Sequence, residues 1–274
     1  MRRLGSSQLA FPDFRGATRR LILLNLGAYF VVLLLSVTSS NWYEWLLERS
    51  VFLPKDFLHG WLWQPLTYSF VHSPQSILGT LLELLSLWFL AGFLEAYHSE
   101  SWVLGLYGAA VLGTAAAGLA IYLAVQMLHG SLAIVPLYGC FGGIFGMLVA
   151  IGILYGDLDF MMFPLPISIK ARYLAVIYGL LALAMLFTEQ KMYAFAQLGG
   201  AAAGWLYLRM MPRRGVGFSL SEQWYGLRNR YFRWKRRRAA RRFEVYMKSQ
   251  GRTVRFDGQG RPMDESPDDK SRWN

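Results

Sequence analysis

The chain has 274 residues, of which 54% are hydrophobic and 16% are charged, and its formal net charge is +11 at pH 7. This composition is too apolar for a soluble domain, and the apolar residues are spread too evenly for a protein with a single membrane anchor. The only cysteine, Cys140, excludes an intrachain disulfide, and we expect neither a cofactor nor a bound metal.

A basic tail, residues 1–20, precedes the first apolar run, which extends from Leu21 to Val37. This run is longer than the apolar core of a usual signal peptide, and no small-x-small cleavage motif follows it. We therefore expect it to be retained as a membrane-spanning helix.

Six apolar stretches approach or exceed the length of roughly 18–20 residues that a helix needs to cross a bilayer. The predicted spans are 21–38, 76–96, 102–127, 133–155, 171–188 and 193–211. The sequence thus predicts an all-α, polytopic membrane domain over residues 21–211.

Two connections between the spans are long. Residues 39–75 contain four tryptophans, which is typical of a segment at the membrane interface, and they are Trp42, Trp45, Trp61 and Trp63. Residues 156–170 contain Pro164 and Pro166, which break any helix there.

The positions of Lys and Arg predict the orientation. With six spans, both termini lie on one side, and 25 of the 28 basic residues fall on that side. Only Arg49, Lys55 and Lys191 fall on the other. Because basic loops stay cytoplasmic, we expect a multi-pass protein of a bacterial inner (plasma) membrane with both termini in the cytoplasm.

Residues 212–250 form a basic, aromatic segment that we expect to be a cytoplasmic helix. Its basic cluster is Arg233, Lys235, Arg236, Arg237, Arg238, Arg241 and Arg242. Each basic residue near an anionic membrane surface contributes about 1 kcal/mol of attraction. Beside six predicted spans, anionic lipid head groups are favoured over nucleic acid as the partner. Residues 251–274 are rich in Gly, Pro, Asp and Ser and are expected to be disordered.

Glycines are dense at two places inside the predicted spans. Glycine in a helix costs about 1 kcal/mol relative to alanine, so the clusters need a reason. Their small-xxx-small spacing predicts that the fourth and sixth spans approach closely. The residues are Gly139, Gly142, Gly143 and Gly146 in the first cluster and Gly199, Gly200 and Gly204 in the second.

Several segments resemble the rhomboid family of intramembrane serine proteases in their order, spacing and topology. They are Trp63 to His72, Leu85 to Glu95, Leu104 to Tyr107, Gly142 to Leu148, the Phe-Pro-Leu-Pro-Ile loop, and Leu198 to Gly200 with Gly204. Together they cover residues 20–211. The resemblance implies a six-helix bundle of rhomboid type.

The resemblance also implies a catalytic serine, a histidine that removes its proton, and a His-xxx-Asn pair that helps to stabilise the oxyanion. The chain departs from the family at each of these positions. Phe141 replaces the serine, Gln197 replaces the histidine, and Gly79 and Glu83 replace the pair. The family also has a Trp-Arg pair in its first loop, and the corresponding residues here are Trp63 and Gln64.

The resemblance therefore implies a proteolytically inactive protein that binds membrane-spanning segments of client proteins, with a lateral opening between the second and fifth spans. Candidate gate residues are Leu84, Trp88, Phe89, Tyr178 and Met185. One alternative is an active serine-type endopeptidase with non-standard residues. Another is a small transporter that uses Glu83 as a proton site.

Four side chains leave narrower alternatives open. All four histidines lie in connections or at span edges, so Cys140 is expected to lack a histidine to deprotonate it, and a buried, inert thiol is favoured over a nucleophile. Glu83 either forms a hydrogen bond with Gln197 or is solvated in a water-filled vestibule. Phe141 fills the former catalytic cavity or blocks it. Glu95 is expected to cap a helix and order a loop.

Overall fold

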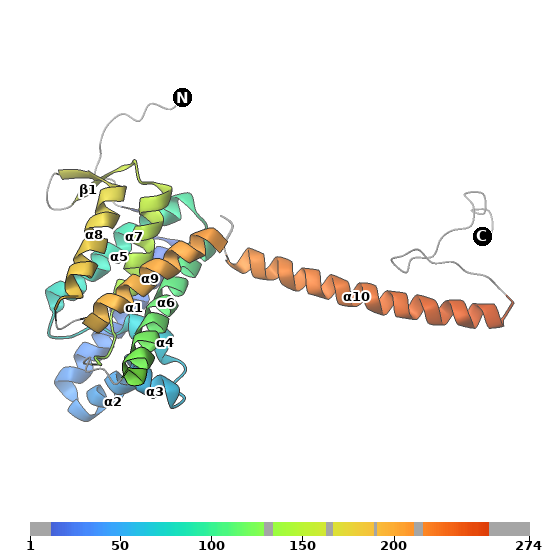
Figure 1. Cartoon of the computed structure of the whole chain (residues 1–274), viewed down its shortest axis with the longest axis horizontal. Coiled ribbons are helices and arrows are strands. Elements are labelled where there is room, and N and C mark those ends of the chain that lie inside the picture. The colour runs from blue at the N-terminus through green and yellow to red at the C-terminus, as the bar shows by residue number, and fades with distance from the viewer. Residues whose placement is uncertain (1–11, 129–133, 163–166, 189–190, 211–215, 252–274) are drawn as a thin grey trace. The chain divides into compact units, whose positions relative to one another are not determined.

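The computed structural model describes residues 12–128, 134–162, 167–188, 191–210 and 216–251. These residues are mainly helical, with one two-stranded sheet, so the fold is all-α in class (Figure 1). The helices are α1 (Gly16–Thr38), α2 (Ser40–Ser50), α3 (Pro54–Leu58), α4 (Gln64–Thr67), α5 (Ile77–Tyr97), α6 (Glu100–Met127), α7 (Phe141–Leu154), α8 (Ala171–Met185), α9 (Lys191–Met210) and α10 (Val216–Ser249), with a 3-10 turn, η1 (Tyr68–Phe70).

Helices α1, α5, α6, α7, α8 and α9 lie at the six predicted spans. Three of them, α1, α5 and α6, are long and apolar enough to cross a membrane. Helices α7 and α8 are apolar but have only 14 and 15 residues. At a rise of about 1.5 Å per residue they are shorter than the hydrocarbon layer, which is about 30 Å thick.

The predicted start of the fourth span at residue 133 is wrong, because α7 begins at Phe141. Two features before Phe141 are incompatible with a helix. Leu137 exchanges backbone hydrogen bonds with Phe52, and Gly139 has a φ of +86°, in the left-handed region. This non-helical stretch holds Cys140 at the N-terminal end of α7.

Part of the predicted glycine contact is present where α7 packs against α9, because Gly142 and Gly146 meet Gly200 and Gly204. A Cβ atom added to Gly204 would lie 2.6 Å from the Cα of Gly146, and one added to Gly200 would lie 2.8 Å from the carbonyl oxygen of Gly142. Only glycine permits so close an approach of two backbones. The prediction of close contact is wrong for Gly143, which faces the Tyr107 ring of α6, and for Gly139, which precedes α7 and lies against Glu83. Gly199 faces α6 instead, and a Cβ atom added to it would lie 2.8 Å from the carbonyl oxygen of Gly113.

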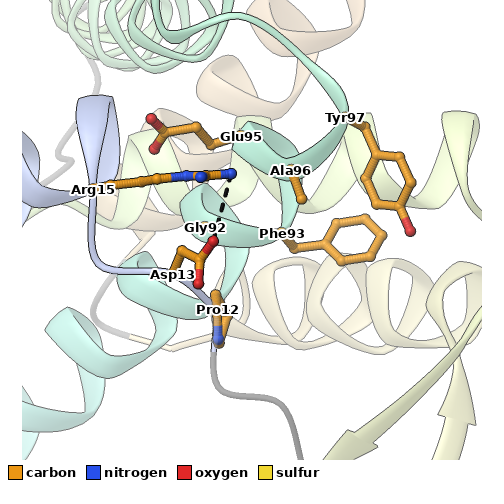
Figure 2. A pocket seen from close by; sticks show the side chains of 8 residues that line it. All are labelled: Pro12, Asp13, Arg15, Gly92, Phe93, Glu95, Ala96 and Tyr97. Carbon is orange, nitrogen blue, oxygen red and sulfur yellow. Dashed lines mark ion pairs between the residues drawn. The ribbon is translucent and has the colours of Figure 1, made fainter.

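Glu95, near the C-terminal end of α5, caps the N-terminus of α1. Its carboxylate accepts hydrogen bonds from the backbone N–H groups of Ala17 and Thr18, each at 2.9 Å, and from the Thr18 hydroxyl at 2.6 Å. Figure 2 shows the pocket beside this cap, where Arg15 extends between Glu95 and Asp13 and forms an ion pair with Asp13. The negative carboxylate thus lies at the positive end of the α1 dipole and joins the first two spanning helices.

The segment between α1 and α5 lies at the end of the bundle opposite the sheet (Figure 1). Gln64 is buried there, and its side chain joins α2 to α4 by donating to the carbonyl oxygen of Glu48. Tyr68 donates from its hydroxyl to the carbonyl oxygen of Val111 in α6 at 2.8 Å. The Arg49 guanidinium lies over the Trp45 ring, 4.5 Å from its centroid. The Tyr68 hydrogen bond thus ties this segment to the bundle, and the other two contacts order the segment itself.

A short antiparallel sheet follows α7, in the segment predicted from its prolines only to break a helix. It pairs β1 (Asp159–Met162) with β2 (Ile167–Lys170), Asp159 opposite Lys170. The prolines predicted to break a helix, Pro164 and Pro166, lie outside the described residues. Beside the sheet, Arg172 forms an ion pair with Asp157.

Helix α10 belongs to a second compact unit, which begins at Gly217. The predicted basic helix of residues 212–250 thus corresponds to a helix that starts at Val216 and ends at Ser249. The basic cluster is exposed, apart from Arg237, whose side chain is not described. The Arg238 guanidinium lies 5.4 Å from the centroid of the Trp234 ring. The tail predicted to be disordered lies, after Gly251, outside the described residues.

Candidate functional site

A cavity of about 710 Å³ opens between α5 and α8, and we call it the α5–α8 groove. Its lining comes from five parts of the chain, which are the loop before α5, α5 itself, the segment before α7 with the start of α7, α8, and α9. The lining residues are His72, Ser73, Ser76, Gly79, Thr80, Glu83, Val135, Pro136, Tyr138, Phe141, Phe145, Tyr178, Leu181, Ala182, Met185, Tyr193 and Gln197.

The four residues that stand at the rhomboid serine, histidine and His-xxx-Asn positions line this groove. They are Gly79 and Glu83 on α5, Phe141 at the start of α7, and Gln197 on α9. Gln64, at the Arg position of the Trp-Arg pair, lies in α4 outside the groove. Gln197 is buried, whereas Phe141 is 36% exposed and packs edge-on against the Tyr193 ring at 6.5 Å. Phe141 therefore forms part of the groove wall.

The predicted gate residues divide into two groups. Tyr178 and Met185 on α8 line the groove. Leu84, Trp88 and Phe89 on α5 do not belong to its lining, since successive residues of a helix point about 100° apart and α5 presents Gly79, Thr80 and Glu83 there instead. A gate role for the three α5 residues stays a prediction.

Glu83 lies at the inner end of the groove and makes no hydrogen bond with Gln197, so the proposed bond between α5 and α9 is absent. The Glu83 carboxylate instead lies 3.6 Å from Nε2 of His72 and faces the backbone N–H groups of Cys140 and Phe141. It also lies against Gly139, where a Cβ atom would come within 2.7 Å of Glu83 Oε1. The positive end of the α7 dipole thus faces this carboxylate.

Backbone hydrogen bonds bring His72 to the start of α7. The N–H of Gly139 donates to the carbonyl oxygen of Val71 at 2.8 Å and to that of Tyr68 at 3.1 Å. The segment before α5 is therefore fixed beside the segment before α7. Burial lowers the pKa of His72 below its ordinary value, so its ring is neutral at pH 7.

Cys140 joins these two side chains in one buried cluster. The ligand atoms of His72, Glu83 and Cys140 all lie within 4.8 Å of one another. The expectation that Cys140 has no histidine to deprotonate it is therefore wrong, since His72 lies beside it. No sequence signal points to the cluster, because His72 lies in a connection outside the predicted spans and no residue spacing places that connection beside Gly139.

The bundle contains three helices that are long and apolar enough to cross a membrane, which defines the class of the protein as a helical integral membrane protein. A comparison with protein families identifies the particular group. Residues 21–233 match the family described as eukaryotic integral membrane protein (DUF1751), and the chain belongs to this family. No curated protein matches the chain.

The family assignment changes one expectation. The family is described as eukaryotic, so the predicted bacterial inner membrane is not supported, whereas an integral, multi-pass membrane protein is. The matched region includes α1 from Leu21 onward, α5 to α9 and the first half of α10.

Proposed function

We propose that the chain is a rhomboid-like membrane protein without proteolytic activity, which binds transmembrane segments of client proteins in the α5–α8 groove. The observation that carries the proposal is that Gly79, Glu83, Phe141 and Gln197 line one groove between helices. These are the positions where the rhomboid resemblance places catalytic groups. Their convergence supports a rhomboid-type arrangement, and their side chains do not form a serine–histidine pair.

The groove favours a polypeptide over a lipid tail because of its composition. Its walls are apolar, with Phe145, Tyr178 and Leu181 among them, while buried Glu83 and Gln197 lie at its inner side. A polar group buried in an apolar environment without a partner costs several kcal/mol in free energy. Glu83 Oε1 lacks a hydrogen-bond partner among the described residues. A hydrocarbon chain leaves this atom unpaired, whereas a transmembrane helix with a polar residue near its middle pairs with it.

The dimensions suit one face of such a helix. A helix with its side chains is about 10 Å wide, so a cavity of this volume holds side chains of a few residues and leaves the rest of the helix in the bilayer. Helices α5 and α8 are not closely packed against each other, so the groove opens to the side. A client segment therefore enters from within the membrane.

The proposal includes an orientation of the chain in the membrane. Six spans place both termini on the cytoplasmic side, as the distribution of basic residues indicates. The exposed basic and aromatic side chains of α10 then lie at a cytoplasmic leaflet, where anionic head groups attract them.

Binding of a designed transmembrane peptide with one central Asn tests the proposal. Leu181 lines the groove, so Leu181→Trp should narrow it and weaken binding about tenfold, which corresponds to about 1.4 kcal/mol. Leu180→Trp is the matched control, since Leu180 lies on the same helix outside the groove lining and is similarly exposed, at 59% against 56%. Fluorescence anisotropy in lipid nanodiscs measures both affinities, and equal affinities would contradict the proposal.

A second candidate is a protease in which Cys140 acts as nucleophile and His72 as base, favoured by their proximity. The burial of Cys140, which has no exposed surface, argues against attack on a substrate. Cleavage of the Asn-containing peptide by the purified chain, abolished by Cys140→Ser, would support this candidate over the inactive one.

A further inference from the structure

His72, Glu83 and Cys140 bring three kinds of metal ligand to one buried place. The exposed fractions of His72, Glu83 and Cys140 are 1%, 7% and 0%, respectively. The ligand atoms lie within 4.8 Å of one another, and His72 Nε2 and Glu83 Oε2 are 3.6 Å apart. In a tetrahedral zinc site with bonds of about 2.0–2.3 Å, neighbouring ligand atoms are roughly 3.3–3.8 Å apart. Small movements of these side chains therefore suffice to bring all three to one ion.

The tautomer of His72 suits metal binding. Nδ1 of His72 lies 3.2 Å from the carbonyl oxygen of Phe70, and since a carbonyl oxygen only accepts, Nδ1 carries the proton and donates. Nε2 then presents a lone pair toward Glu83 and Cys140. A hydrogen bond from the second ring nitrogen to a backbone carbonyl is the usual support of a histidine that binds a metal.

Two buried polar atoms of the cluster lack hydrogen-bond partners among the described residues. They are Nε2 of His72 and Oε1 of Glu83. A buried polar atom without a partner is costly and calls for an explanation, such as an ion that it binds. Cys140 is the fully buried N-cap residue of α7, and its thiol would lose its proton when an ion binds.

We propose that His72, Glu83 and Cys140 bind a single Zn²⁺ ion at the inner end of the α5–α8 groove. Thiolate, imidazole and carboxylate are the ligands that zinc uses in proteins, and one thiolate with one carboxylate balances the charge of the ion. His72 and Glu83 line the groove, so the fourth ligand position faces it. Three protein ligands with one open position is the arrangement of catalytic zinc sites, whereas structural sites are closed by four.

The test uses the full chain, purified in detergent, stripped with a chelator and titrated with Zn²⁺ and with Co²⁺. We expect about one Zn²⁺ per chain and, with Co²⁺, a thiolate-to-metal charge-transfer band that Cys140→Ser abolishes. Mutation of a residue that only hydrogen-bonds to a metal ligand weakens metal binding about 10- to 100-fold. Because His72 and Glu83 would be ligands themselves, His72→Gln and Glu83→Gln should each weaken Zn²⁺ binding at least tenfold. His59→Gln is the control, because His59 is exposed and lies outside the cluster.

A thermal-unfolding measurement separates metal loss from misfolding. Zn²⁺ should raise the Tm of the stripped wild-type chain and of His59→Gln but not that of Cys140→Ser. Absence of the charge-transfer band in the wild-type chain, or unchanged Zn²⁺ affinity in Cys140→Ser, would overturn the proposal. Neither readout uses a client peptide, so the metal site stands or fails independently of client binding.

Discussion

Replacing Gly204 by leucine is expected to prevent the helical bundle from folding, and Gly204→Ala to lower its free energy of unfolding by about 3 kcal/mol. A Cβ atom at this position would lie 2.6 Å from the Cα of Gly146 and 2.9 Å from its carbonyl oxygen. Both contacts are with backbone atoms, which cannot move aside as a flexible side chain does. Helix α9 would therefore have to separate from α7, and the contact that brings Gln197 toward Phe141 would be lost.

Gly108→Ala provides the control for Gly204→Ala. Gly108 also lies within a membrane helix, α6, but a Cβ atom there meets nothing within 4 Å. Alanine should then be neutral or stabilise the chain by up to about 1 kcal/mol, through its higher helix propensity and lower unfolded-state entropy. Unfolding in mixed detergent micelles measures both variants. Equal stabilities would show that the α7–α9 glycine contact does not hold the bundle together.

Gly139→Ala has the second largest expected effect. The φ of +86° disfavours any residue with a Cβ atom, by about 1–2 kcal/mol. The added atom would also approach Glu83 Oε1 within 2.7 Å. We expect a loss of more than 2 kcal/mol in the free energy of unfolding, because the carboxylate must leave the N-terminus of α7.

Gly60→Ala separates the two parts of this loss, since Gly60 has a φ of +107° and nothing within 4 Å of an added Cβ atom. Gly60→Ala therefore introduces the backbone strain of a positive φ without any close contact of the added Cβ atom. The stability difference between Gly139→Ala and Gly60→Ala thus reports the contact with Glu83, and Glu83→Ala should reduce it when combined with Gly139→Ala. If the two glycine variants lose the same stability, the contact has no measurable energy.

The helices of this fold were predictable from sequence because apolar length and glycine spacing are local properties. The runs that became α1, α5 and α6 are long and apolar enough to cross a membrane. The spacing of Gly200 and Gly204 also indicated a face for close helix contact, and in the structure that face meets Gly142 and Gly146. The length of an apolar run and the spacing of its glycines can each be read from the sequence of a single helix.

The details of the groove depended on contacts that no sequence period encodes. Gly139 donates to Tyr68 and Val71, residues about seventy positions earlier, and this pairing places His72 beside Cys140. The rhomboid resemblance selected Glu83 and Gln197 as neighbours, and both line the groove, yet Glu83 lies toward His72. A histidine in a connecting segment gives no signal of its place in three dimensions.

Site-specific photo-crosslinking tests the central claim most directly, namely that transmembrane clients bind in the α5–α8 groove. A photoreactive amino acid at position 181 faces the groove, and one at position 180 lies outside its lining with similar exposure. With the Asn-containing peptide in the same bilayer, position 181 should give several-fold more peptide adduct than position 180. Equal yields at the two positions, or adducts to lipid alone at position 181, would contradict the account.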